Sequence, residues 1–595
     1  METIVGIDLG TTNSEIAVIV DDQVKVIGQD GDRMLPSVIG LDTAGNLLVG
    51  ESARNQAALA TGRTVRSVKR QMGEEVRLPL GDESFTPQEL SAMILRRLVE
   101  QAEGELETSI SKAVITVPAY FDDNQRAATK EAGELAGLEV VRILNEPTAA
   151  ALAYSSRKED KECVLVYDLG GGTFDVSVVM IEQGVVEVLA SHGDTHLGGD
   201  DMDQLLLDYV CDSFQREHGI DLRENAVSHA RMRNAVEDAK KQLSNEPFAQ
   251  IQEEFIAKSG DVPLHVDVEL SRYEFEQLIT ELVQQTLTCV KQALTDARIV
   301  AARIDKVVLV GGATRTPLVA RMLEEQLGQR VHSEVEPDLC VAMGAAIQAG
   351  LIAGVDIGPV LVDITPHTLG IAVLGELHGD LSPFRFSRII RRMTALPASR
   401  SEVYATSMDG QDLVRICVYQ GDDDDIRKNT LIGEMQVDGL MDVEAGNEVT
   451  VQFDLDLNGM LHVRAVERVT GLTREIEMDS VASRFKEEEQ AAATRRLSTV
   501  FGQVLASSEW ATESSTDVAT ETEDAVPQKI QGAISKANRL LDRAETAKGF
   551  VPQDDADELA EMSRAIKIAI VDQDQGKLGK LVPELEDLLF YLDVE

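Results

Sequence analysis

One segment of this chain of 595 residues occurs twice, and the repeat constrains the fold more than any other feature. Residues 5–18 read VGIDLGTTNSEIAV, and residues 165–178 read LVYDLGGGTFDVSV. In each copy an apolar strand reaches Asp-Leu-Gly, turns at glycine and leaves as a second strand of period two, which is the pattern of a β-hairpin. Two such hairpins predict a pseudo-symmetric pair of α/β lobes that face each other across a cleft. The alternative is a chance match between two glycine-containing hairpins.

Further periodic segments extend this α/β unit to about residue 355. Residues 112–118 (KAVITVP) predict another buried strand, and residues 124–137 alternate Ala with charged residues at helical spacing. Residues 304–317 (IDKVVLVGGATRTP) predict a strand and a Gly-Gly turn, followed by a helix at 317–327. The Gly/Ala-rich segment 341–352 predicts a helix that packs closely against neighbouring backbone.

The pattern changes after residue 354. Short alternating segments, separated by turns such as Asp409-Gly410 and Asn458-Gly459, predict a sandwich of β-hairpins. From residue 481 the pattern is helical, and an acidic, Ser/Thr-rich insertion around residues 505–525 is typical of a solvated segment. The predicted organisation is therefore an α/β unit at 1–355, a linker at 356–364, a β-sandwich at 365–480 and a helical segment at 481–595.

Three glycine-rich turns carry the chemistry of the α/β unit. They read DLGTTN at 8–13, GGGT at 170–173 and GGAT at 311–314. Glycine allows the backbone to approach an anion, successive N–H groups form an anion-binding nest, and the third turn also opens a helix. Together the turns predict a triphosphate clamp. The carboxylates of Asp8, Asp168 and Asp175 lie on the same turns, where hydrated Mg²⁺ would link them to phosphate; the alternative is that they only form turns.

Charge and composition exclude several classes of function. The chain has 56 Lys and Arg against 103 Asp and Glu, a formal net charge of −47, which argues against nucleic-acid partners and anionic membranes. Its longest apolar runs are too short for a membrane helix, and the N-terminus has no basic and apolar leader. The five cysteines are scattered, so no disulfide framework is expected. These features predict a cytoplasmic protein.

These segments resemble the heat shock protein 70 chaperone family of the DnaK class. The matching motifs, in the family's order, are IDLGTT (7–12), VPAYF (117–121), NEPTAAALAY (145–154), DLGGGTFD (168–175), GDTHLGG (193–199), VGGATRTP (310–317), MGAAIQ (343–348) and VLVDITPHTL (360–369). The short segment after Lys69, together with LVDITPHTLG and VYQGDDDDIRKN, is most similar to the bacterial HscC-like branch. The resemblance implies an α/β actin-like two-lobed ATPase domain, then a β-sandwich peptide-binding domain and a short α-helical lid.

The resemblance also implies roles for residues in the cleft. As catalytic residues, Lys69 would orient the attacking water, Glu146 and Asp168 would position Mg²⁺ and its waters, and Thr173 would lie beside the γ-phosphate of ATP. Mg²⁺ would be held through the phosphates and waters near Asp8, Glu146 and Asp168, and K⁺ is a further expected cation. The implied nucleotide-binding residues are Asp8, Gly10, Thr11, Thr12, Asn13, Gly170, Gly171, Gly172, Asp175, Gly198, Gly199, Glu237, Lys240, Lys241, Ser244, Gly311, Gly312, Arg315 and Asp338.

Two more sets of residues follow from the resemblance. Those implied in coupling, where a J-domain co-chaperone would act, are Pro118, Arg126, Arg142, Asn145, Leu361, Val362 and Asp363. From the residues alone, the apolar linker could equally be an edge strand. The residues implied in peptide binding are Ile371, Leu374, Tyr404, Ser407, Val414 and Ile416, although half of such positions would simply form the sandwich core.

The predicted function is that of an ATP-dependent chaperone, an ATPase that binds and releases extended apolar peptide segments of unfolded proteins. Its expected partners are client polypeptides, a J-domain co-chaperone and a GrpE-type nucleotide exchange factor, with no nucleic acid and no membrane. Alternatives are a small-molecule kinase of the same fold, an actin-like filament protein, and a chaperone relative with a mainly regulatory or holdase role. The linker and the β-rich region argue against the kinase and the filament protein, and the intact catalytic residues argue against the third alternative.

Overall fold

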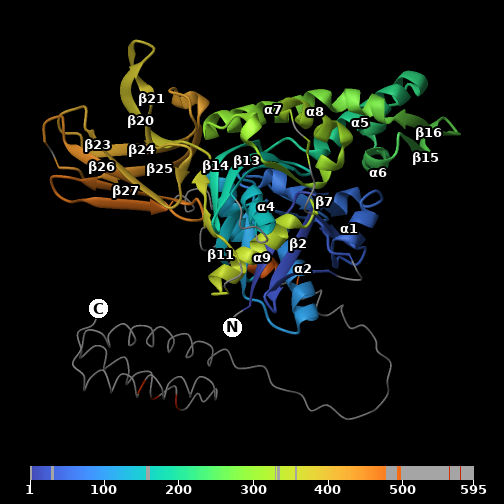
Figure 1. Ribbon diagram of the computed structural model, residues 1–595, viewed down its shortest axis with the longest axis horizontal. Coiled ribbons are helices and arrows are strands. Elements are labelled where there is room, and N and C mark those ends of the chain that lie inside the picture. The colour runs from blue at the N-terminus through green and yellow to red at the C-terminus, as the bar shows by residue number, and fades with distance from the viewer. Residues whose placement is uncertain are drawn as a thin grey trace. The chain divides into compact units, whose positions relative to one another are not determined.

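The computed structural model describes residues 3–28, 32–155, 161–328, 330–331, 336–355, 358–441, 443–477 and 492–497, with 501, 562, 577 and 580 (Figure 1). Contacts divide the chain into two units, Met1–Glu509 and Trp510–Glu595. The predicted acidic insertion and most of the predicted lid lie outside the described residues. Within the described part of the chain, no helix is long and apolar enough to cross a membrane.

The first lobe is built on a mixed sheet with strand order β11-β10-β1-β2-β3, with β4 paired to β2. The first repeat forms its central antiparallel hairpin, in which Asp8 faces Glu15, and β10 lies parallel to β1. The bounds are β1 Ile4–Asp8, β2 Asn13–Val20, β3 Gln23–Ile27, β4 Leu35–Pro36, β10 Lys112–Val117 and β11 Glu139–Asn145. Smaller strands of this lobe are β5 Val38–Leu41, β6 Leu47–Val49, β7 Thr64–Arg66, β8 Leu78–Leu80 and β9 Glu83–Phe85.

The second lobe repeats this plan, with strand order β17-β12-β13-β14-β18. The second repeat forms the antiparallel pair β12–β13, in which Asp168 faces Asp175, and β17 lies parallel to β12 as β10 lies parallel to β1. The bounds are β12 Glu162–Leu169, β13 Phe174–Glu182, β14 Val185–Asp194, β17 Lys306–Val310 and β18 Val360–Val362. The predicted pair of pseudo-symmetric hairpins is therefore confirmed.

Helices cover both sheets, and their ends follow local capping chemistry. Thr86 and Glu89 form a capping box at the start of α2, and Asp122 and Gln125 form one at the start of α3. The helices are α1 Glu51–Gln56, α2 Pro87–Leu106, α3 Asp123–Leu135, α4 Glu146–Ser155, α5 Gly199–His218, α6 Ala226–Asn245, α7 Arg272–Ala297, α8 Pro317–Leu327 and α9 Cys340–Ile352. A further hairpin, β15 Phe248–Ser259 with β16 Val262–Ser271, follows α6.

Helix α9 packs closely against neighbouring backbone, as its Gly/Ala-rich sequence predicts. A Cβ atom on Gly344 would lie 1.8 Å from the carbonyl oxygen of Ala149 in α4. A Cβ atom on Gly6 of β1 would likewise lie 2.1 Å from the backbone nitrogen of Ala346. Helix α9 is therefore fixed at van der Waals distance from β1 of the first lobe and from α4.

The predicted sandwich consists of two four-stranded antiparallel sheets, ordered β21-β20-β24-β25 and β23-β26-β27-β28. Its core contains Ile371, Ile416, Val451 and Phe453, all buried. The bounds are β20 Leu369–Leu377, β21 Asp380–Ile390, β23 Ala398–Ala405, β24 Leu413–Gln420, β25 Thr430–Asp438, β26 Glu448–Leu455, β27 Leu461–Glu467 and β28 Thr473–Glu477. The short strands β19 Ile364–Thr365 and β22 Thr394–Ala395 pair beside it.

The predicted linker extends a sheet in this structure. Strand β18 pairs in parallel with β14 at the edge of the second lobe, Leu361 opposite Val186 and Val362 opposite Glu187. Residues 356 and 357 of the predicted linker lie outside the described residues.

A short helical segment from the predicted lid region lies against the first lobe. Ala493 and Leu497 are buried in the core of that lobe. Arg496 donates from Nε to Oε1 of Glu89 at 2.9 Å, and the Glu89 side chain is fully buried. Because the Glu89 carboxylate is fully buried, losing its guanidinium partner would leave a buried charge without compensation.

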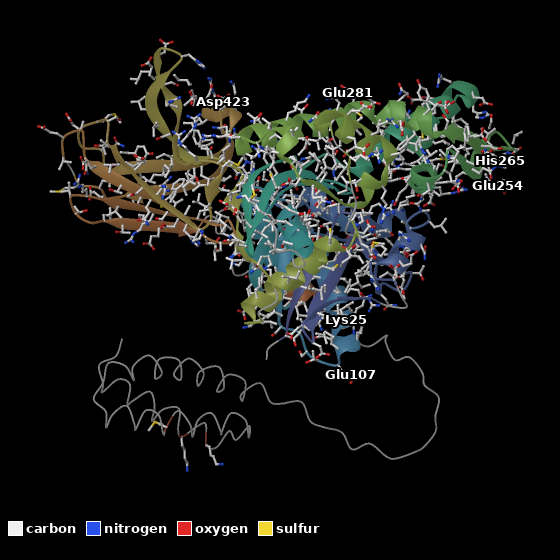
Figure 2. All side chains as sticks on the ribbon, viewed as in Figure 1. Lys25, Glu107, Glu254, His265, Glu281 and Asp423 are labelled. Carbon is white, nitrogen blue, oxygen red and sulfur yellow. The ribbon has the colours of Figure 1, made fainter. Side chains whose placement is uncertain are left out.

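Acidic side chains are spread over the outside of the first unit. Glu107, Glu254 and Glu281 are exposed and project away from the ribbon (Figure 2). The excess negative charge is therefore carried in part by solvated positions on several elements.

We expect Gly344→Ala to lower the free energy of unfolding by about 2–3 kcal/mol, because the added methyl group overlaps the Ala149 carbonyl. Gly104→Ala is the matched control, since a Cβ there meets open space on helix α2, and it should be neutral or stabilising by up to about 1 kcal/mol. Urea-induced unfolding of both variants tests this. Equal effects of the two changes would contradict the close packing of α9.

We expect Arg496→Ala to release the segment 492–497 from the first lobe, because Glu89 then loses its closest cationic partner. The rate of hydrogen–deuterium exchange in that segment should rise at least tenfold, which corresponds to a decrease of more than about 1.4 kcal/mol in the free energy of local opening. Arg54→Ala, which removes an exposed pair with Glu51 in the same lobe, should leave this exchange unchanged. Unaltered protection in Arg496→Ala would show that apolar contacts alone hold the segment.

Candidate functional site

A cavity of about 90 Å³ lies where the glycine-rich turns of the two lobes meet. Its lining contains most of the predicted phosphate and catalytic residues and comes from both repeats. The lining residues are Asp8, Gly10, Thr11, Thr12, Asn13, Glu15, Lys69, Glu146, Asp168, Gly170, Gly171, Thr173, Val310, Gly311, Gly312, Pro337, Asp338 and Val341.

Glycine is required where these turns touch each other. A Cβ atom on Gly171 would lie 2.0 Å from the hydroxyl oxygen of Thr12 in the facing lobe. Gly311 has a φ angle of 80°, and its Cβ would lie 2.4 Å from the Leu169 carbonyl oxygen. The three turns therefore bring backbone N–H groups to one small volume, as a phosphate clamp requires.

Lys69 and Glu146 form a buried ion pair in the wall of the cavity. The ammonium group of Lys69 donates to Oε1 of Glu146, and both residues are almost fully buried. Burial opposes the charge on Lys69, but the carboxylates of Glu146 and Asp8 outweigh it and raise the pKa of Lys69. A lysine that stays protonated beside the cavity is suited to stabilising negative charge on a phosphate.

The predicted metal-positioning carboxylates are crowded and desolvated. Burial, and then the charge of Glu146, raise the pKa of Asp8 to about 7, although Thr116 donates to it at 2.9 Å. Burial and Glu146 raise the pKa of Asp168 in the same way. Such carboxylates fit a cation that neutralises them. Within the described ranges, no group of three or more His, Cys, Asp or Glu is arranged to hold a metal ion.

Glu15 is a further carboxylate in this cavity, and the sequence analysis did not identify it. It faces Asp8 across the first hairpin and is only 3% exposed. Burial, followed by the charges of Asp8 and Asp338, raises the pKa of Glu15 well above its usual value. The available signal was an acid at an inward position of an otherwise apolar strand, where a charge is costly.

The residues predicted to contact the nucleoside lie beside the cavity rather than in its lining. On α6, Lys240 pairs with Asp203 at 2.7 Å, and Lys241 pairs with Glu237 at 2.6 Å. Ser244 donates to the carbonyl oxygen of Lys240 at 3.4 Å. Arg315 pairs with Asp338, which does line the cavity. The predicted residues Gly172, Asp175, Gly198 and Gly199 also lie outside the lining.

Polar contacts join the lobes beside the cavity. Arg70 donates to the His196 carbonyl oxygen and to Asp201, each at 3.0 Å. Ser67 donates to Asp200 at 2.6 Å. These contacts hold residues next to Lys69 against the start of α5.

Three of the predicted coupling residues, Arg126, Asn145 and Asp363, form one hydrogen-bonded chain next to the ion pair. Arg126 donates to Oδ1 of Asn145 at 2.7 Å and to the Ala119 carbonyl oxygen at 3.0 Å, one residue after Pro118. Asn145 in turn donates to Oδ2 of Asp363 at 3.0 Å, and Thr148 donates to the same oxygen at 3.2 Å. Asp363 immediately follows β18 and is only 6% exposed. The linker is thus tied to Asn145, the direct neighbour of Glu146.

Arg142 has a different environment from the other predicted coupling residues. It lies on β11 opposite Val114, and its Nε is buried without a hydrogen-bond partner in the described part of the chain. Burial lowers the pKa of Arg142, whereas nearby Asp363 and Asp456 favour its charged form. Arg142 therefore lies within the electrostatic influence of the linker carboxylate.

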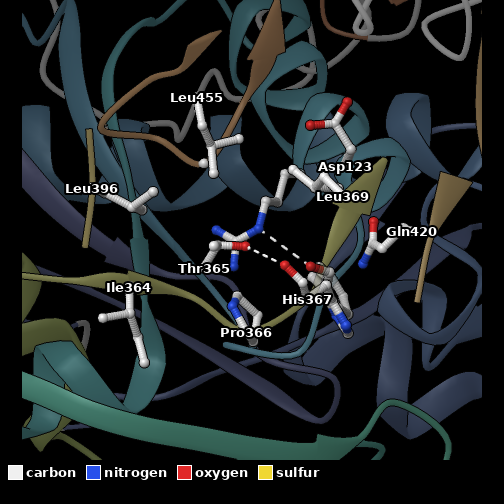
Figure 3. Close-up of a pocket in the computed structure, with 12 residues that line it drawn as sticks. Asp123, Ile364, Thr365, Pro366, His367, Leu369, Leu396, Gln420 and Leu455 are labelled. Atoms are coloured by element: carbon white, nitrogen blue, oxygen red, sulfur yellow. Dashed lines mark hydrogen bonds between the residues drawn. The ribbon is translucent and has the colours of Figure 1, made fainter. Parts of the chain in front are cut away.

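The sandwich contacts the lobes at this same place. Ile143 donates its backbone N–H to the Asn458 side chain at 3.1 Å, and Leu461 donates its backbone N–H to Asp123 at 3.1 Å. Figure 3 shows the junction, where Pro366, Leu396 and Leu455 surround a cavity of about 20 Å³ that Arg126 also lines. The sequence analysis identified Arg126 and Asn145 but not Asn458, whose carbonyl oxygen accepts from Arg126 and lies 332 positions away in the chain.

The predicted peptide-binding positions fall into two groups. Ile371 and Ile416 are buried in the sandwich core, which Val414 and Tyr404 also contact, and the Tyr404 hydroxyl bonds to Ser387 at 2.9 Å. Leu374 is 54% exposed, and the backbone N–H of Ser407 donates to Gln411. The structure thus places these residues on strands and loops of one sandwich, partly inside its core.

Comparison with known proteins agrees with this geometry. A family model described as Hsp70 protein matches residues 4–80 and 74–591 of the chain. The chaperone protein DnaK of Thermotoga petrophila is 47% identical over 479 residues, which cover 79% of this chain and 79% of that protein. These matches confirm the predicted fold class and the predicted function of an ATP-dependent chaperone with ATPase activity, and they favour it over the kinase and filament alternatives. This chain belongs to the Hsp70 protein family.

Proposed function

We propose that this chaperone couples ATP hydrolysis between its lobes to the capture and release of apolar peptide segments by the sandwich, and that Asp363 is the link. The observation that carries the proposal is the buried Asp363 carboxylate, bonded to Asn145 and Thr148 on either side of Glu146 in sequence. A movement of Glu146 would thus be transmitted to Asp363 in the linker through its direct neighbours in the chain, without a flexible segment between them. The predicted boundaries at 1–355, 356–364, 365–480 and 481–595 form part of this proposal.

In the hydrolytic step, positioning and electrostatics would do the work. Lys69 would orient the attacking water and stabilise charge on the γ-phosphate, because its ammonium group is held in place by Glu146. Thr173 lines the same cavity and would contact the γ-phosphate, while Glu146 and Asp168 would orient water. Mg²⁺, bound through the phosphates and water near Asp8, Glu146 and Asp168, would neutralise charge, and K⁺ would add to this shell.

The remaining predicted nucleotide residues would hold the rest of ATP. The turns at Gly10–Asn13, Gly170–Gly172 and Gly311–Gly312 would donate backbone N–H groups to the phosphates. Asp175, Gly198 and Gly199 would support those turns. The nucleoside would lie against Glu237, Lys240, Lys241 and Ser244, and Arg315 and Asp338 would complete its pocket. Lys241 and Glu237 form an ion pair, which would have to open for the base to bind between them.

In the structure, linker residues form strand β18. We propose that this arrangement is the docked state, one of two states of the protein. In the docked state, with ATP, β18 pairs with β14 and the sandwich contacts the lobes. After hydrolysis, β18 would leave the sheet edge, the sandwich would separate from the lobes, and the groove formed by Ile371, Leu374, Tyr404, Ser407, Val414 and Ile416 would close on peptide. Such strand addition is a reversible way to join two modules.

Partners and lineage complete the proposal. A J-domain co-chaperone would act at Arg142, Asn145 and the linker, where the hydrogen bonds to Asp363 could be altered from outside. A GrpE-type factor would promote nucleotide exchange. The short segment after Lys69 supports placement in the HscC-like branch, and the protein would act in the cytoplasm on unfolded chains.

We expect Lys69→Ala to reduce single-turnover ATP hydrolysis by at least about 100-fold, because a charge-stabilising donor at the γ-phosphate is lost. Binding of ATP, measured by calorimetry, should change by less than about tenfold. Lys161→Ala removes an exposed lysine paired with Glu182 and should leave both quantities unchanged. Hydrolysis at the normal rate in Lys69→Ala would refute its role.

We expect Asp363→Asn to retain basal ATP hydrolysis within about threefold but to abolish the effect of ATP on peptide release. The amide has no charge and only one acceptor oxygen, so it cannot accept from Ile364 as well as from Asn145 and Thr148, and the docked state loses a charge-assisted anchor. Dissociation of a fluorescent apolar peptide should accelerate with ATP in the normal protein and respond at least about tenfold less in the variant. Asp438→Asn, at an exposed pair with Arg474, is the control. A normal ATP response in Asp363→Asn would refute the proposed link.

A further inference from the structure

Two histidines enclose one tyrosine at the contact between the lobes and the sandwich. The ring of Tyr120 lies 5.0 Å from that of His192, at an interplanar angle of 27°, and 4.4 Å from that of His367. Tyr120 follows β10 in the first lobe, His192 lies on β14 of the second lobe, and His367 lies between β19 and β20. The stack therefore joins both lobes to the sandwich, and Figure 3 shows His367 at the edge of the junction.

Hydrogen bonds connect this stack to the nucleotide site. The backbone N–H of Tyr120 donates to Oδ1 of Asp175 at 3.0 Å, and Asp175 faces Asp168 across the second hairpin. The carbonyl oxygen of Tyr120 lies 3.1 Å from Nε2 of His367. Because a carbonyl oxygen only accepts, Nε2 of His367 carries the proton, and its Nδ1 is the position where a further proton would bind.

We propose that the stack of His192, Tyr120 and His367 is a proton-sensitive lock, which holds the sandwich on the lobes while both imidazoles are neutral and releases it on acidification. The proposal rests on the docked and released states of the proposed function. It adds a signal, pH, to the nucleotide as a determinant of docking.

The environment of the stack favours neutral rings. His367 is buried, which lowers its pKa to about 4 despite the Tyr120 carbonyl, and Arg126 adds to the effect. Burial also lowers the pKa of His192, and Arg392 contributes in the same direction. The Asp422 carboxylate raises the pKa of both imidazoles, and the carboxylates of Asp194 and Asp296 raise that of His192, but burial outweighs them. For Tyr120, burial raises the pKa to about 12, so its ring stays neutral near neutral pH.

An ion pair across the same contact would amplify the response. Arg392 of the sandwich pairs with Oδ1 of Asp296 on α7 at 2.9 Å. The other oxygen of Asp296 and Nδ1 of His192 are buried, and neither has a hydrogen-bond partner among the described residues. A proton on His192 would place a second buried cation near Arg392, and the repulsion between the two cations would weaken the interdomain contact that Arg392 makes.

The sign of the effect follows from linkage. In the released state His367 is solvated and has an ordinary pKa near 6.5, whereas docking lowers this pKa to about 4. The docked state therefore binds fewer protons than the released state between these values, and docking weakens as the pH falls through this window. From pH 7.5 to pH 5.5, His367 alone would lower the docking equilibrium constant about tenfold.

The test uses the full chain with saturating ATP or ADP. Hydrogen–deuterium exchange of residues 358–363, corrected for the intrinsic effect of pH, reports how far β18 leaves β14. With ATP, we expect exchange at pH 5.5 about tenfold above that at pH 7.5. His367→Gln keeps an N–H donor for Tyr120 but cannot be protonated, and with His192→Gln it should reduce this rise to less than about threefold. His378→Gln, at an exposed position of the sandwich, should keep the full rise.

The outcomes separate the lock from the coupling. If exchange at pH 7.5 does not differ between ATP and ADP, the proposed coupling fails and the lock fails with it. If exchange differs between ATP and ADP but exchange with ATP is the same at pH 7.5 and pH 5.5, only the lock is overturned. The same holds if the double variant keeps the full pH response. Should the variant be undocked at pH 7.5, NMR titration of His367 in the unaltered protein decides: a pKa below about 5 with ATP supports the lock, and one near 6.5 overturns it.

Discussion

Burial of the Asp363 carboxylate is the constraint on which the arrangement of the first unit depends. Burial raises the pKa of Asp363, and the group stays in place because Ile364, Asn145 and Thr148 supply hydrogen bonds while Arg126 and Arg142 supply charge. If any donor moves, a buried carboxylate is left without compensation, which is among the largest penalties a single group can impose. The linker can therefore occupy β18 only while the end of β11 and the start of α4 keep one particular conformation.

The same principle explains why the cleft is built around a bound nucleotide. Burial, and then the charges of nearby carboxylates, raise the pKa values of Asp8, Glu15 and Asp168, and within the cavity lining Lys69 is the only Lys or Arg side chain. The negative charges of this cleft are therefore compensated only in part by the side chains that line it. Bound cations and phosphates would rearrange its charges, and Glu146, which shares the ion pair with Lys69, is adjacent to Asn145. Charge in the cleft and docking of the linker are thus parts of one network.

Local sequence patterns predicted most of the fold but few of the contacts that join its parts. The repeat gave both hairpins, and helix α8 was predicted with its observed bounds, because period and capping depend on near neighbours. The sequence analysis did not identify Glu15, although it occupies in the first repeat the position that Asp175 occupies in the second. The Arg496–Glu89 and Arg392–Asp296 pairs could not be predicted, because each joins residues brought together only by the tertiary fold. The four predicted catalytic residues do line one cavity, and their roles stay predictions.

The contact between the lobes and the sandwich is predominantly one of hydrogen bonds and paired charges, which suits a contact that must break. Asn458, Asp123 and Arg392 each contribute a directional bond across it, and the cavity among its apolar residues is only about 20 Å³. Water can replace such bonds on release, so each contributes only about 0.5–1.5 kcal/mol net. An interface with a large apolar core would lose far more on separation. The imidazoles of His192 and His367 differ from the other contacts in that their charge, and not only their geometry, changes between the docked and the released state as the pH falls below neutral.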